Sequence, residues 1–346
     1  MHKPWLLYIC LNDGSDTRIN KEVQTLSQQF DIHYVGIGRN RYNSFAAAFC
    51  RPFTVIPGHH KEPLTLLKWW GKVAGLLLTG KYQSVHLINE QLVLLFYPLL
   101  LGRRRRVVLD IFDSIFLRKN GRMAWLQRVV YSLPGSIIVT DDNRKGLMPP
   151  YAHPKTRVVE NYPYHYPERP AKNGLPDELI IFYNGSMSRS RGTELLRNLL
   201  DQYPHCKVRM AGWVYDEPTR ELTRHPRVEF MGVITQQQSM RVAAACDYIL
   251  SLYEPVNENN INASPNKIYD AIQAGTPVII NGEVKIAAFV QEKGLGYVLE
   301  SFYQTNYHQI AADLVRSKKQ FRFPEELRKH YTWEAIEEKL LAAHTR

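Results

Sequence analysis

The segment from Asn257 to Gly282 reads NENNINASPNKIYDAIQAGTPVIING and contains a predicted helix. The apolar run DYILSLY that precedes it is typical of a buried strand. Ser264 is a favourable N-cap, Pro265 suits the first helical position, and Gly275 can end the helix in a left-handed conformation. The sequence therefore predicts a strand, a polar loop, a helix from Pro265 to Ala274 and the strand TPVII.

The N-terminus of this helix is expected to bind an anion, because free backbone N–H groups and the positive end of the helix dipole meet there. Asn266, Lys267 and Asp270 lie near one helix face, whereas Ile268 and Ile272 face the other side and pack on the sheet. The first face thus offers an amide, a cation and a carboxylate. The plainer alternative is an exposed ion pair between Lys267 and Asp270.

Length and composition predict a soluble protein of two domains with a basic surface. The chain has 346 residues, of which 45% are hydrophobic and 22% charged, and its formal net charge is +11. Positive charge favours anionic partners such as nucleotide phosphates, acidic lipids or nucleic acid, and a solvated basic surface without a specific partner is the alternative. The basic residues lack the aromatic-interleaved stripe typical of nucleic-acid binding, so no nucleic-acid partner is expected. The four cysteines are far apart, as expected of reduced packing residues in a cytoplasmic protein.

Two apolar segments of the N-terminal half bear on membrane contact. Leu92–Gly102 (LVLLFYPLLLG), which Arg103–Arg106 follow, has about half the roughly 20 residues that a membrane-spanning helix needs. Leu64–Leu78 (LTLLKWWGKVAGLLL) is typical either of a helix lying in a membrane interface or of a core helix with a basic edge. We therefore expect no membrane span, and a peripheral contact of the N-terminal domain with acidic membrane is one reading of these segments. The N-terminal segment MHKPWLLYICLNDG reads as a first strand rather than a signal peptide.

Strands and helices alternate along the chain in two series. The predicted strands of the first are WLLYICL, DIHYVGI, SVHLIN, RVVLDIF, GSIIVTDD and RVVENY, and those of the second are ELIIFYNG, KVRMAGW, VEFMG, DYILSLY, TPVII and GYVLE. Such apolar runs separated by helices predict parallel sheets that helices cover on both faces. The proline-rich segment 162–176 between the two series predicts a linker.

Polar residues follow several of the predicted strands, at the sheet edge where open α/β sheets bind their ligands. In the first half these residues are Asp13, Arg18, Asn89, Glu90, Asp110, Asp113, Thr140 and Asp141, and in the second half they fall in the segments 185–191, 253–258 and 262–270.

The order of these segments resembles that of the GT-B glycosyltransferases, in particular the retaining group known as family 4. FYNGSMSRSRGTELL resembles the glycine turn and basic pair before the first helix of that family's donor domain, and ASPNKIYDAIQAGTPVI resembles its nucleotide-sugar motif. HYTWEAIEEKL resembles the final helix. The resemblance implies an α/β fold with two Rossmann-like doubly wound domains that face a central cleft. The implied segments are an acceptor domain over 1–161, a linker over 162–176, a donor domain over 177–320, and a segment over 321–346 whose helix returns to the first domain.

The resemblance also implies roles for individual residues. Asp270 stands at the second carboxylate of the family's paired-carboxylate motif, which binds the ribose hydroxyls, and Arg191 stands at the Lys that neutralises the donor diphosphate. Gly185 marks the tight turn. The implied donor-binding residues are Gly185, Arg189, Arg191, Tyr253, Ser264, Pro265, Asn266, Lys267 and Asp270. Asp113, Arg191 and Asn262 are the implied catalytic residues, and Asp13, Arg18, Asn89 and Glu90 lie on the acceptor side.

The sequence departs from the family's pattern at three positions. Asn262 replaces the first carboxylate, eight residues before Asp270. Ser186 replaces the first basic residue of the diphosphate pair, where Arg189 is the nearby substitute, and Phe112 replaces the His before Asp113. These replacements alter the expected contacts with the sugar and with the diphosphate.

The chemistry of the predicted reaction fits these residue types. Breaking a nucleotide-sugar bond leaves a diphosphate, whose developing charge needs cations and oriented N–H groups. Arg191 suits this task because its guanidinium is always charged and presents its donors as a planar fork. In the alternative reading, Arg189 and Arg191 lie at the solvent-exposed start of a helix and bind no ligand. The sequence has no Asp-x-Asp and no His cluster with metal-ligand spacing, so we expect metal-independent transfer with no cofactor besides a UDP- or GDP-linked sugar.

The sequence thus predicts a glycosyltransferase that moves a sugar, with retention, to a saccharide or lipid-linked saccharide acceptor. Its expected setting is surface polysaccharide or lipopolysaccharide biosynthesis in the cytoplasm, at the cytoplasmic face of the inner membrane. A nucleotide-sugar epimerase or hydrolase on the same fold, and a non-catalytic basic module that binds nucleic acid or acidic membrane, are the alternatives.

Overall fold

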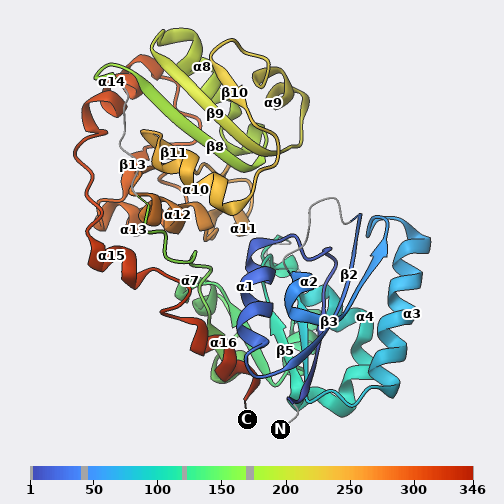
Figure 1. Ribbon diagram of the computed structural model, residues 1–346. Helices are drawn as coiled ribbons and strands as arrows, with labels where there is room; N and C mark the ends of the chain where they lie inside the picture. Colours follow the sequence, from blue (N-terminus) through green and yellow to red (C-terminus); the bar gives the residue numbers. More distant parts are fainter. Residues whose placement is uncertain (1–2, 40–45, 119–122, 169–174, 346) are drawn as a thin grey trace. The chain divides into compact units, whose positions relative to one another are not determined.

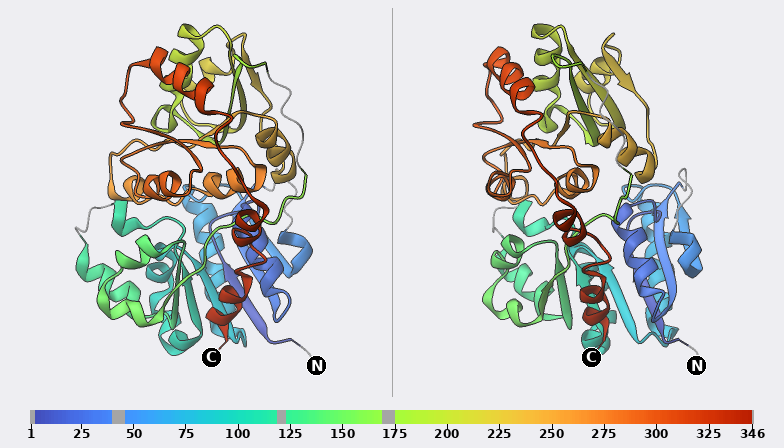
Figure 2. Two further views of the ribbon diagram at one scale, coloured as in Figure 1. Left: turned by 90° about the vertical axis from the view of Figure 1, so that its left-hand side faces the viewer. Right: turned by 60° about the vertical axis from the view of Figure 1, so that its left-hand side comes forward.

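The computed structural model describes residues 3–39, 46–118, 123–168 and 175–345 of the chain (Figure 1). The chain divides into two compact units. Unit 1 comprises Met1–Asn161 and Ile336–Arg346, and unit 2 comprises Tyr162–Ala335. Each unit contains one parallel β-sheet with helices packed around it, so the α/β fold predicted from the alternating strands is confirmed (Figure 2). Part of the predicted linker, 169–174, lies outside the described residues.

Unit 1 contains a seven-stranded sheet of order β3-β2-β1-β4-β5-β6-β7, in which every neighbouring pair is parallel. The strand order reverses at β1, between β2 and β4, where ligands of doubly wound sheets bind. The strands are β1 Trp5–Ile9, β2 Asp31–Gly38, β3 Cys50–Pro57, β4 Ser84–Ile88, β5 Val107–Asp110, β6 Ser136–Val139 and β7 Thr156–Val158. The helices are α1 Thr17–Leu26, α2 Ala46–Phe49, α3 Pro63–Thr79, α4 Glu90–Leu100, α5 Ile115–Arg118, α6 Ala124–Ser132, α7 Asp142–Gly146 and α16 Glu337–His344, with the 3-10 turns η1 Leu101–Arg106 and η2 Pro150–Lys155.

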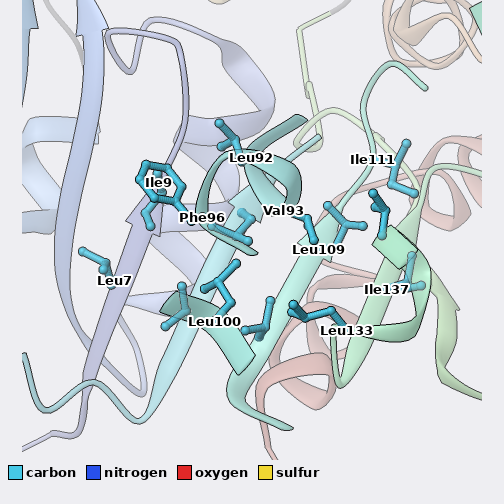
Figure 3. Packing of buried hydrophobic residues seen from close by; sticks show 14 of the residues in the cluster. Leu7, Ile9, Leu92, Val93, Phe96, Leu100, Leu109, Ile111, Leu133 and Ile137 are labelled. Atoms are coloured by element: carbon cyan, nitrogen blue, oxygen red, sulfur yellow. The ribbon is translucent and has the colours of Figure 1, made fainter. Parts of the chain in front are cut away.

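The core of unit 1 forms where α4 packs on the sheet. Leu92, Phe96 and Leu100 recur every four residues along α4, so they share one helix face, and all three are fully buried. They belong to the same apolar cluster as Leu7 of β1 and Leu109 of β5 (Figure 3). This packing fixes the carboxyl ends of β1, β4 and β5, from which the polar loops of unit 1 begin.

Unit 2 contains a six-stranded parallel sheet of order β10-β9-β8-β11-β12-β13. The strands are β8 Leu179–Met187, β9 Cys206–Val214, β10 Val228–Phe230, β11 Tyr248–Leu250, β12 Val278–Asn281 and β13 Gly296–Leu299. The helices are α8 Thr193–Gln202, α9 Glu217–Leu222, α10 Gln236–Ala244, α11 Glu258–Ile261, α12 Asn266–Ala274, α13 Ala287–Glu292, α14 Tyr307–Ser317 and α15 Glu325–His330, with the 3-10 turn η3 Arg189–Arg191. The strand order reverses between β8 and β11, so the loops after these two strands flank the switch point of this sheet.

Two elements differ from those that the sequence predicts. Strand β3 was not predicted, because Arg51 and Pro52 break its apolar pattern and it pairs with β2 alone at the sheet edge. The final helix expected in HYTWEAIEEKL starts later in the structure, since α16 begins at Glu337. Trp333, which precedes the helix, is fully buried in unit 2, and its backbone N–H donates to the Pro163 carbonyl at 2.8 Å.

The cysteines and the helix lengths bear on two further expectations. All four cysteines are buried and free, and burial raises the pKa of Cys10, Cys50 and Cys206 to about 12. Their thiols therefore remain protonated and act as small apolar side chains, as the sequence predicts.

Each helix in the described part of the chain is too short or too polar to cross a membrane.

Candidate functional site

The glycine turn at the end of β8 brings two strands together and leaves room for a side chain of α12. Gly185 has φ +81° and Gly212 of β9 has φ +133°, which are left-handed conformations that favour glycine. A Cβ at Gly212 would lie 2.1 Å from the Gly185 carbonyl oxygen, so the strands meet too closely for any side chain there. A Cβ at Gly185 would lie 3.9 Å from Cε of Lys267, which places the Lys267 side chain beside this turn.

The loop between β8 and α8 is fixed from within by a buried tyrosine. The Tyr183 hydroxyl accepts a hydrogen bond from the Ser188 N–H at 2.8 Å and donates to the Ser188 carbonyl at 3.0 Å. Burial raises the pKa of Tyr183 to about 12, so the hydroxyl stays protonated and retains both bonds at neutral pH. The Arg189 N–H donates to the Asp216 carboxylate at 2.7 Å, and Gly192, with φ +103°, turns the chain into α8. The loop therefore holds its arginine side chains in defined positions.

The guanidinium of Arg191 in this loop has neither a counter-ion among the described residues nor a hydrogen-bond partner for every donor. Its guanidinium stacks on the ring of Tyr253, 3.7 Å from Cζ to the ring centroid, and its Nη1 is buried without a hydrogen-bond partner. Arg191 makes no ion pair within the described residues, whereas Arg189 pairs with Glu194 at 3.1 Å. A buried cationic donor without an acceptor is costly in a folded protein, so this arrangement favours binding of an anion.

The Lys267 ammonium lies close to the same arginine. Its Nζ donates to the Leu250 carbonyl at 3.0 Å and lies 5.5 Å from the centroid of the Tyr183 ring. Burial, reinforced by the charge of Arg191, lowers the pKa of Lys267 to about 7, while Asp270 acts in the opposite direction. The charges of Arg191 and Lys267 thus repel each other near the ends of β8 and β11. An anion bound between them would relieve this repulsion.

The N-terminus of α12 differs by one residue from the prediction. Pro265 occupies the N-cap position and the helix begins at Asn266, so the prediction of Ser264 as the N-cap was wrong. Proline has no side-chain acceptor, and no side chain caps the first turn. The first N–H groups of the helix therefore remain available to a ligand on the side where Lys267 lies.

Asp270 and Asn262, the two positions of the family's paired motif, lie in different surroundings. Asp270 is half-buried on α12, and its Oδ1 accepts a hydrogen bond from Nε2 of Gln236 on α10 at 3.1 Å. Asn262 is buried, and its Nδ2 donates to the Glu258 carbonyl at 2.8 Å and to the Glu258 carboxylate at 2.9 Å. The amide of Asn262 thus holds the exposed carboxylate of Glu258, four residues upstream in α11.

Several residues that shape this site were missed by sequence reasoning. Asn281 holds the backbone of Tyr253, accepting from its N–H and donating to its carbonyl, both at 3.0 Å. An asparagine at the end of a predicted strand was the available signal for it. Tyr183, lying inside a strand, and Gln236, which is 34 positions away from its partner Asp270, gave no local signal.

In unit 1, Asn89 and Glu90 organise the loop that follows β5. Asn89 has φ +68°, the one positive value among the described non-glycine residues, and its Oδ1 accepts from the N–H groups of Phe112 at 2.8 Å and Asp113 at 3.0 Å. Glu90 is buried and accepts from the hydroxyls of Ser114 at 2.7 Å and Tyr131 at 2.9 Å. These contacts leave Asp113 exposed at the loop surface. A strained backbone at a residue that holds such a loop is typical of a functional region.

Arg18 is buried rather than exposed at the edge of unit 1. Its guanidinium donates to Glu22 at 2.7 Å, to Asp110 at 2.9 Å and to the Val159 carbonyl at 3.0 Å. The Phe112 ring covers it, with the ring centroid 4.9 Å from Cζ. The charge of Arg18 is therefore neutralised inside unit 1.

The other acceptor-side candidate, Asp13, is half-buried in the loop after β1. Its Oδ1 accepts from the Ser15 N–H at 3.2 Å, and a Cβ at Gly38 of β2 would lie 2.3 Å from Cβ of Asp13. Asp13 therefore lies beside the carboxyl end of β2, in the loop that follows β1.

Three ligand-type side chains meet beneath these loops. Glu22, His86 and Asp110 are the one group of His, Cys, Asp or Glu in the described residues whose ligand atoms lie within 4.8 Å of one another, and all three are fully buried. Burial lowers the pKa of His86, which favours its uncharged form, and raises the pKa of Glu22, an effect that the charge of Arg18 opposes. The guanidinium of Arg18 already bridges both carboxylates, so this cluster is a network closed around an internal cation.

No model of a known protein family matches the sequence, and no curated protein matches it. Solved structures do match the fold over nearly the whole chain. Sucrose-phosphate synthase from Thermosynechococcus elongatus matches with a TM-score of 0.70 at 17% identity, over 99% of this chain and 98% of that chain. Anabaena HepE in complex with UDP matches with a TM-score of 0.68 at 13% identity, over 98% of both chains. UDP-N-acetylglucosamine 2-epimerase from Rickettsia bellii matches with a TM-score of 0.64 at 10% identity, over 99% of this chain and 96% of that chain.

Similarity at these identities establishes the fold and leaves the activity open. The two parallel sheets, of seven and six strands, match the two Rossmann-like domains of these structures. The chain therefore has the GT-B fold, as its sequence predicted.

Proposed function

We propose that this protein transfers a sugar from a nucleotide-sugar donor to a saccharide or lipid-linked saccharide acceptor. The observation that carries the proposal is the pair formed by Arg191, whose Nη1 is buried and unpaired, and Lys267, whose pKa is lowered to about 7. Neither cation makes an ion pair within the described residues, and both lie at strand ends next to the uncapped N-terminus of α12. A diphosphate supplies the charge and the several acceptor oxygens that such a site needs.

The same groups would promote departure of the nucleoside diphosphate. Negative charge grows on the phosphate oxygens as the bond to the sugar breaks, and cations already in place stabilise that charge without reorganisation. Arg191 is held for this purpose by stacking on Tyr253 and by the short turn that ends at Gly192. Lys267 gains a proton more readily when the diphosphate is present, because the anion offsets the repulsion from Arg191.

The remaining donor contacts follow from the surroundings of α12. Asp270 would bind the ribose hydroxyls while Gln236 orients its carboxylate. Asn262 would act on the sugar through Glu258, because its amide holds the exposed Glu258 carboxylate. That carboxylate supplies a negative charge near Asn262, the position where the motif's first carboxylate is missing. We assign the donor as UDP-linked, because HepE was solved with UDP and the epimerase is named for a UDP sugar. Metal-independent transfer with retention is the mechanism that the resemblance to family 4 favours.

The acceptor side is assigned to the loops of unit 1. Asp113 is exposed on a loop that Asn89 and Glu90 hold through backbone and hydroxyl groups, so it is the candidate to contact an acceptor hydroxyl. Asp13 is the second candidate. Arg18 and Glu90 act by positioning this loop and do not contact the acceptor, because both side chains are buried and bonded within the unit.

A nucleotide-sugar epimerase or hydrolase is the second candidate, since an epimerase has the same fold. Both activities need the same cations for the diphosphate, so donor binding alone does not separate them. Incubation of UDP-sugars with and without a panel of saccharide acceptors, followed by proton NMR, distinguishes them. A transferase forms a new glycoside only when an acceptor is present, whereas an epimerase yields a stereoisomer of the donor without one.

Calorimetric titration with UDP, UMP and uridine tests the donor site directly. We expect UDP to bind about 100-fold more tightly than UMP, because the second phosphate reaches Arg191 and Lys267, and each charge-assisted hydrogen bond contributes about 1.5–3 kcal/mol. Asp270→Ala should weaken UDP and uridine alike, since it removes a ribose contact. Equal affinities for UDP and UMP, or unchanged affinity in Asp270→Ala, would show that the site is assigned wrongly.

A further inference from the structure

Helix α3 of unit 1 exposes an apolar stripe. Leu64, Leu67 and Leu78 are 74%, 63% and 67% exposed. The solvent-facing positions of a surface helix usually carry polar or charged residues instead of leucine. A side chain at Gly71 or Gly75 would meet no atom within 4 Å, so the surface between the leucines is open. Figure 1 shows α3 at the edge of unit 1, next to α4.

The helical period places these residues on one line. At about 100° per residue, Leu64, Leu67, Gly71, Gly75 and Leu78 fall within roughly 80° of one another around the axis. The buried residues of α3, among them Trp69, Val73 and Leu77, occupy the opposite side and hold the helix on the sheet. The exposed stripe is therefore a second apolar face, about 21 Å long, which the fold of unit 1 does not use.

Helix α4 and the turn η1 extend this surface. The Trp70 indole N–H donates to the Leu95 carbonyl at 3.2 Å, and its ring stacks on Phe96, so Trp70 joins the middle of α3 to the middle of α4. Arg103 donates to the Gly80 carbonyl at 3.0 Å, which joins η1 to the end of α3. Leu95 and Leu101 are exposed in α4 and η1, and Trp70 is exposed to 40%.

Cations outnumber carboxylates around the apolar stripe, and the exposed carboxylate of Glu62, at the N-cap of α3, lies 3.8 Å from the guanidinium of Arg39. From residue 63 to residue 106 the basic side chains are Lys68, Lys72, Lys81 and Arg103–Arg106, and the one carboxylate is the fully buried Glu90. Lys68 and Lys72 follow one side of the stripe at helical spacing. Arg104 and Arg105 are exposed, and their side chains make no hydrogen bond or ion pair among the described residues.

We propose that this surface, formed by α3, α4 and η1, binds the face of an anionic lipid bilayer. The leucines and Trp70 would enter the interfacial region while the lysines and arginines reach the phosphates, as in amphipathic helices that lie in a membrane surface. A second copy of the chain is disfavoured as the occupant, because two such basic surfaces would repel each other. The proposal is independent of the donor site in unit 2 and places the protein beside lipid-linked substrates.

Sedimentation of the full chain with vesicles tests the proposal. Vesicles of phosphatidylcholine with about 30% phosphatidylglycerol are compared with vesicles of phosphatidylcholine alone, at low and physiological salt. We expect binding to the anionic vesicles, reduced at least tenfold by Leu64→Asp combined with Leu67→Asp, because two partly exposed leucines no longer enter the interface. Arg104→Gln combined with Arg105→Gln should weaken binding to anionic vesicles by up to about 25-fold, at about fivefold for each lost cation.

Matched variants in unit 2 are the controls. Leu175→Asp changes a leucine that is 68% exposed, and Arg224→Gln combined with Lys319→Gln removes the same charge from exposed positions. Neither control should change vesicle binding by more than about twofold, and circular dichroism should show every variant folded. Equal losses in the controls and the test variants, or no binding to anionic vesicles, would overturn the proposal. Sedimentation velocity without vesicles tests whether a second copy of the chain binds this surface instead. A dimer that dissociates when Leu64→Asp is combined with Leu67→Asp would also overturn the membrane proposal.

Discussion

Arg18 in unit 1 and Arg191 in unit 2 both follow the first strand of a parallel sheet, yet their surroundings are opposite. Arg18 is enclosed by the carboxylates of Glu22 and Asp110, so its charge is balanced inside the fold. Arg191 stacks on Tyr253 with Nη1 buried and unpaired, and its nearby charge is the ammonium of Lys267. The difference teaches that position at a strand end does not by itself make an arginine a ligand-binding residue. The missing counter-ion is what makes Arg191 the candidate to bind an anion.

The two arrangements differ in what they contribute to folding. A balanced buried ion network adds little net stability, but removal of one member leaves an uncompensated charge at high cost. Two cations without counter-ions oppose folding slightly and favour any state with a bound anion. Mutations in unit 1 should therefore act on stability, and mutations in unit 2 should act on ligand affinity.

The largest expected effect is that of Arg18→Met on stability. The substitution keeps much of the side-chain volume but leaves Glu22 and Asp110 buried together without a cation, which costs about 3–5 kcal/mol. Urea unfolding followed by circular dichroism measures the loss. Arg220→Met, which breaks an exposed pair with Glu217, should cost less than about 1 kcal/mol. A loss no larger than that of this control would contradict the description of Arg18 as the internal counter-ion.

The next effect is that of Arg191→Ala on donor affinity. Loss of the guanidinium should weaken UDP binding about 10- to 100-fold, because one or more charge-assisted hydrogen bonds worth about 1.5–3 kcal/mol disappear. Stability without ligand should stay within about 1 kcal/mol of the parent, since the side chain has no ion pair within the described residues and loses only its stacking on Tyr253, worth about 0.5–1 kcal/mol. Titration calorimetry and urea unfolding measure the two quantities on the same samples, with Arg220→Ala as the matched control. A variant that loses stability but keeps its affinity for UDP would reverse the roles of the two arginines.

The pH dependence of UDP binding should identify Lys267. The pKa of its ammonium is about 7 without ligand, and a bound diphosphate raises it, so the protein takes up a proton on binding above pH 7. Affinity should therefore fall as pH rises from about 7, by at most tenfold per unit, or 1.36 kcal/mol. Calorimetry at pH 8 in buffers of different ionisation enthalpy measures the proton uptake. Lys267→Met should abolish it, and a pH-independent affinity in the parent protein would refute this account.

The smallest effect is expected at Gln236, which bonds Asp270 from α10. Gln236→Ala should weaken UDP binding about two- to fivefold, because one hydrogen bond that orients the carboxylate is lost, at about 0.5–1.5 kcal/mol. Its exposed neighbour Gln237 is the matched control. In the background of Asp270→Ala, the effect of Gln236→Ala should disappear. Additive losses in the double variant would show that Gln236 acts elsewhere.

Much of the fold followed from the local pattern of the sequence. Apolar runs alternating with helices are enough to predict a parallel sheet, because strands buried on both faces need no polar positions. The helix α12 was predicted within one residue, since Gly275 and Pro277 end it by their own backbone preferences. Strand β3 was not predicted, because Arg51 and Pro52 are residue types more typical of a loop. An edge strand tolerates them, since one of its sides is unpaired.

The sequence by itself determined two α/β units, the glycine turn of β8 and the helix that begins beside Lys267, because turn chemistry and hydrophobic period are properties of neighbouring residues. Tertiary structure alone decided which charges are balanced. Arg18 meets Asp110 across 92 positions, and Gln236 meets Asp270 across 34, so no local pattern records these contacts. The pKa of a lysine and the availability of an arginine depend on burial and on neighbours brought together by the sheet, and those are set only when the chain has folded.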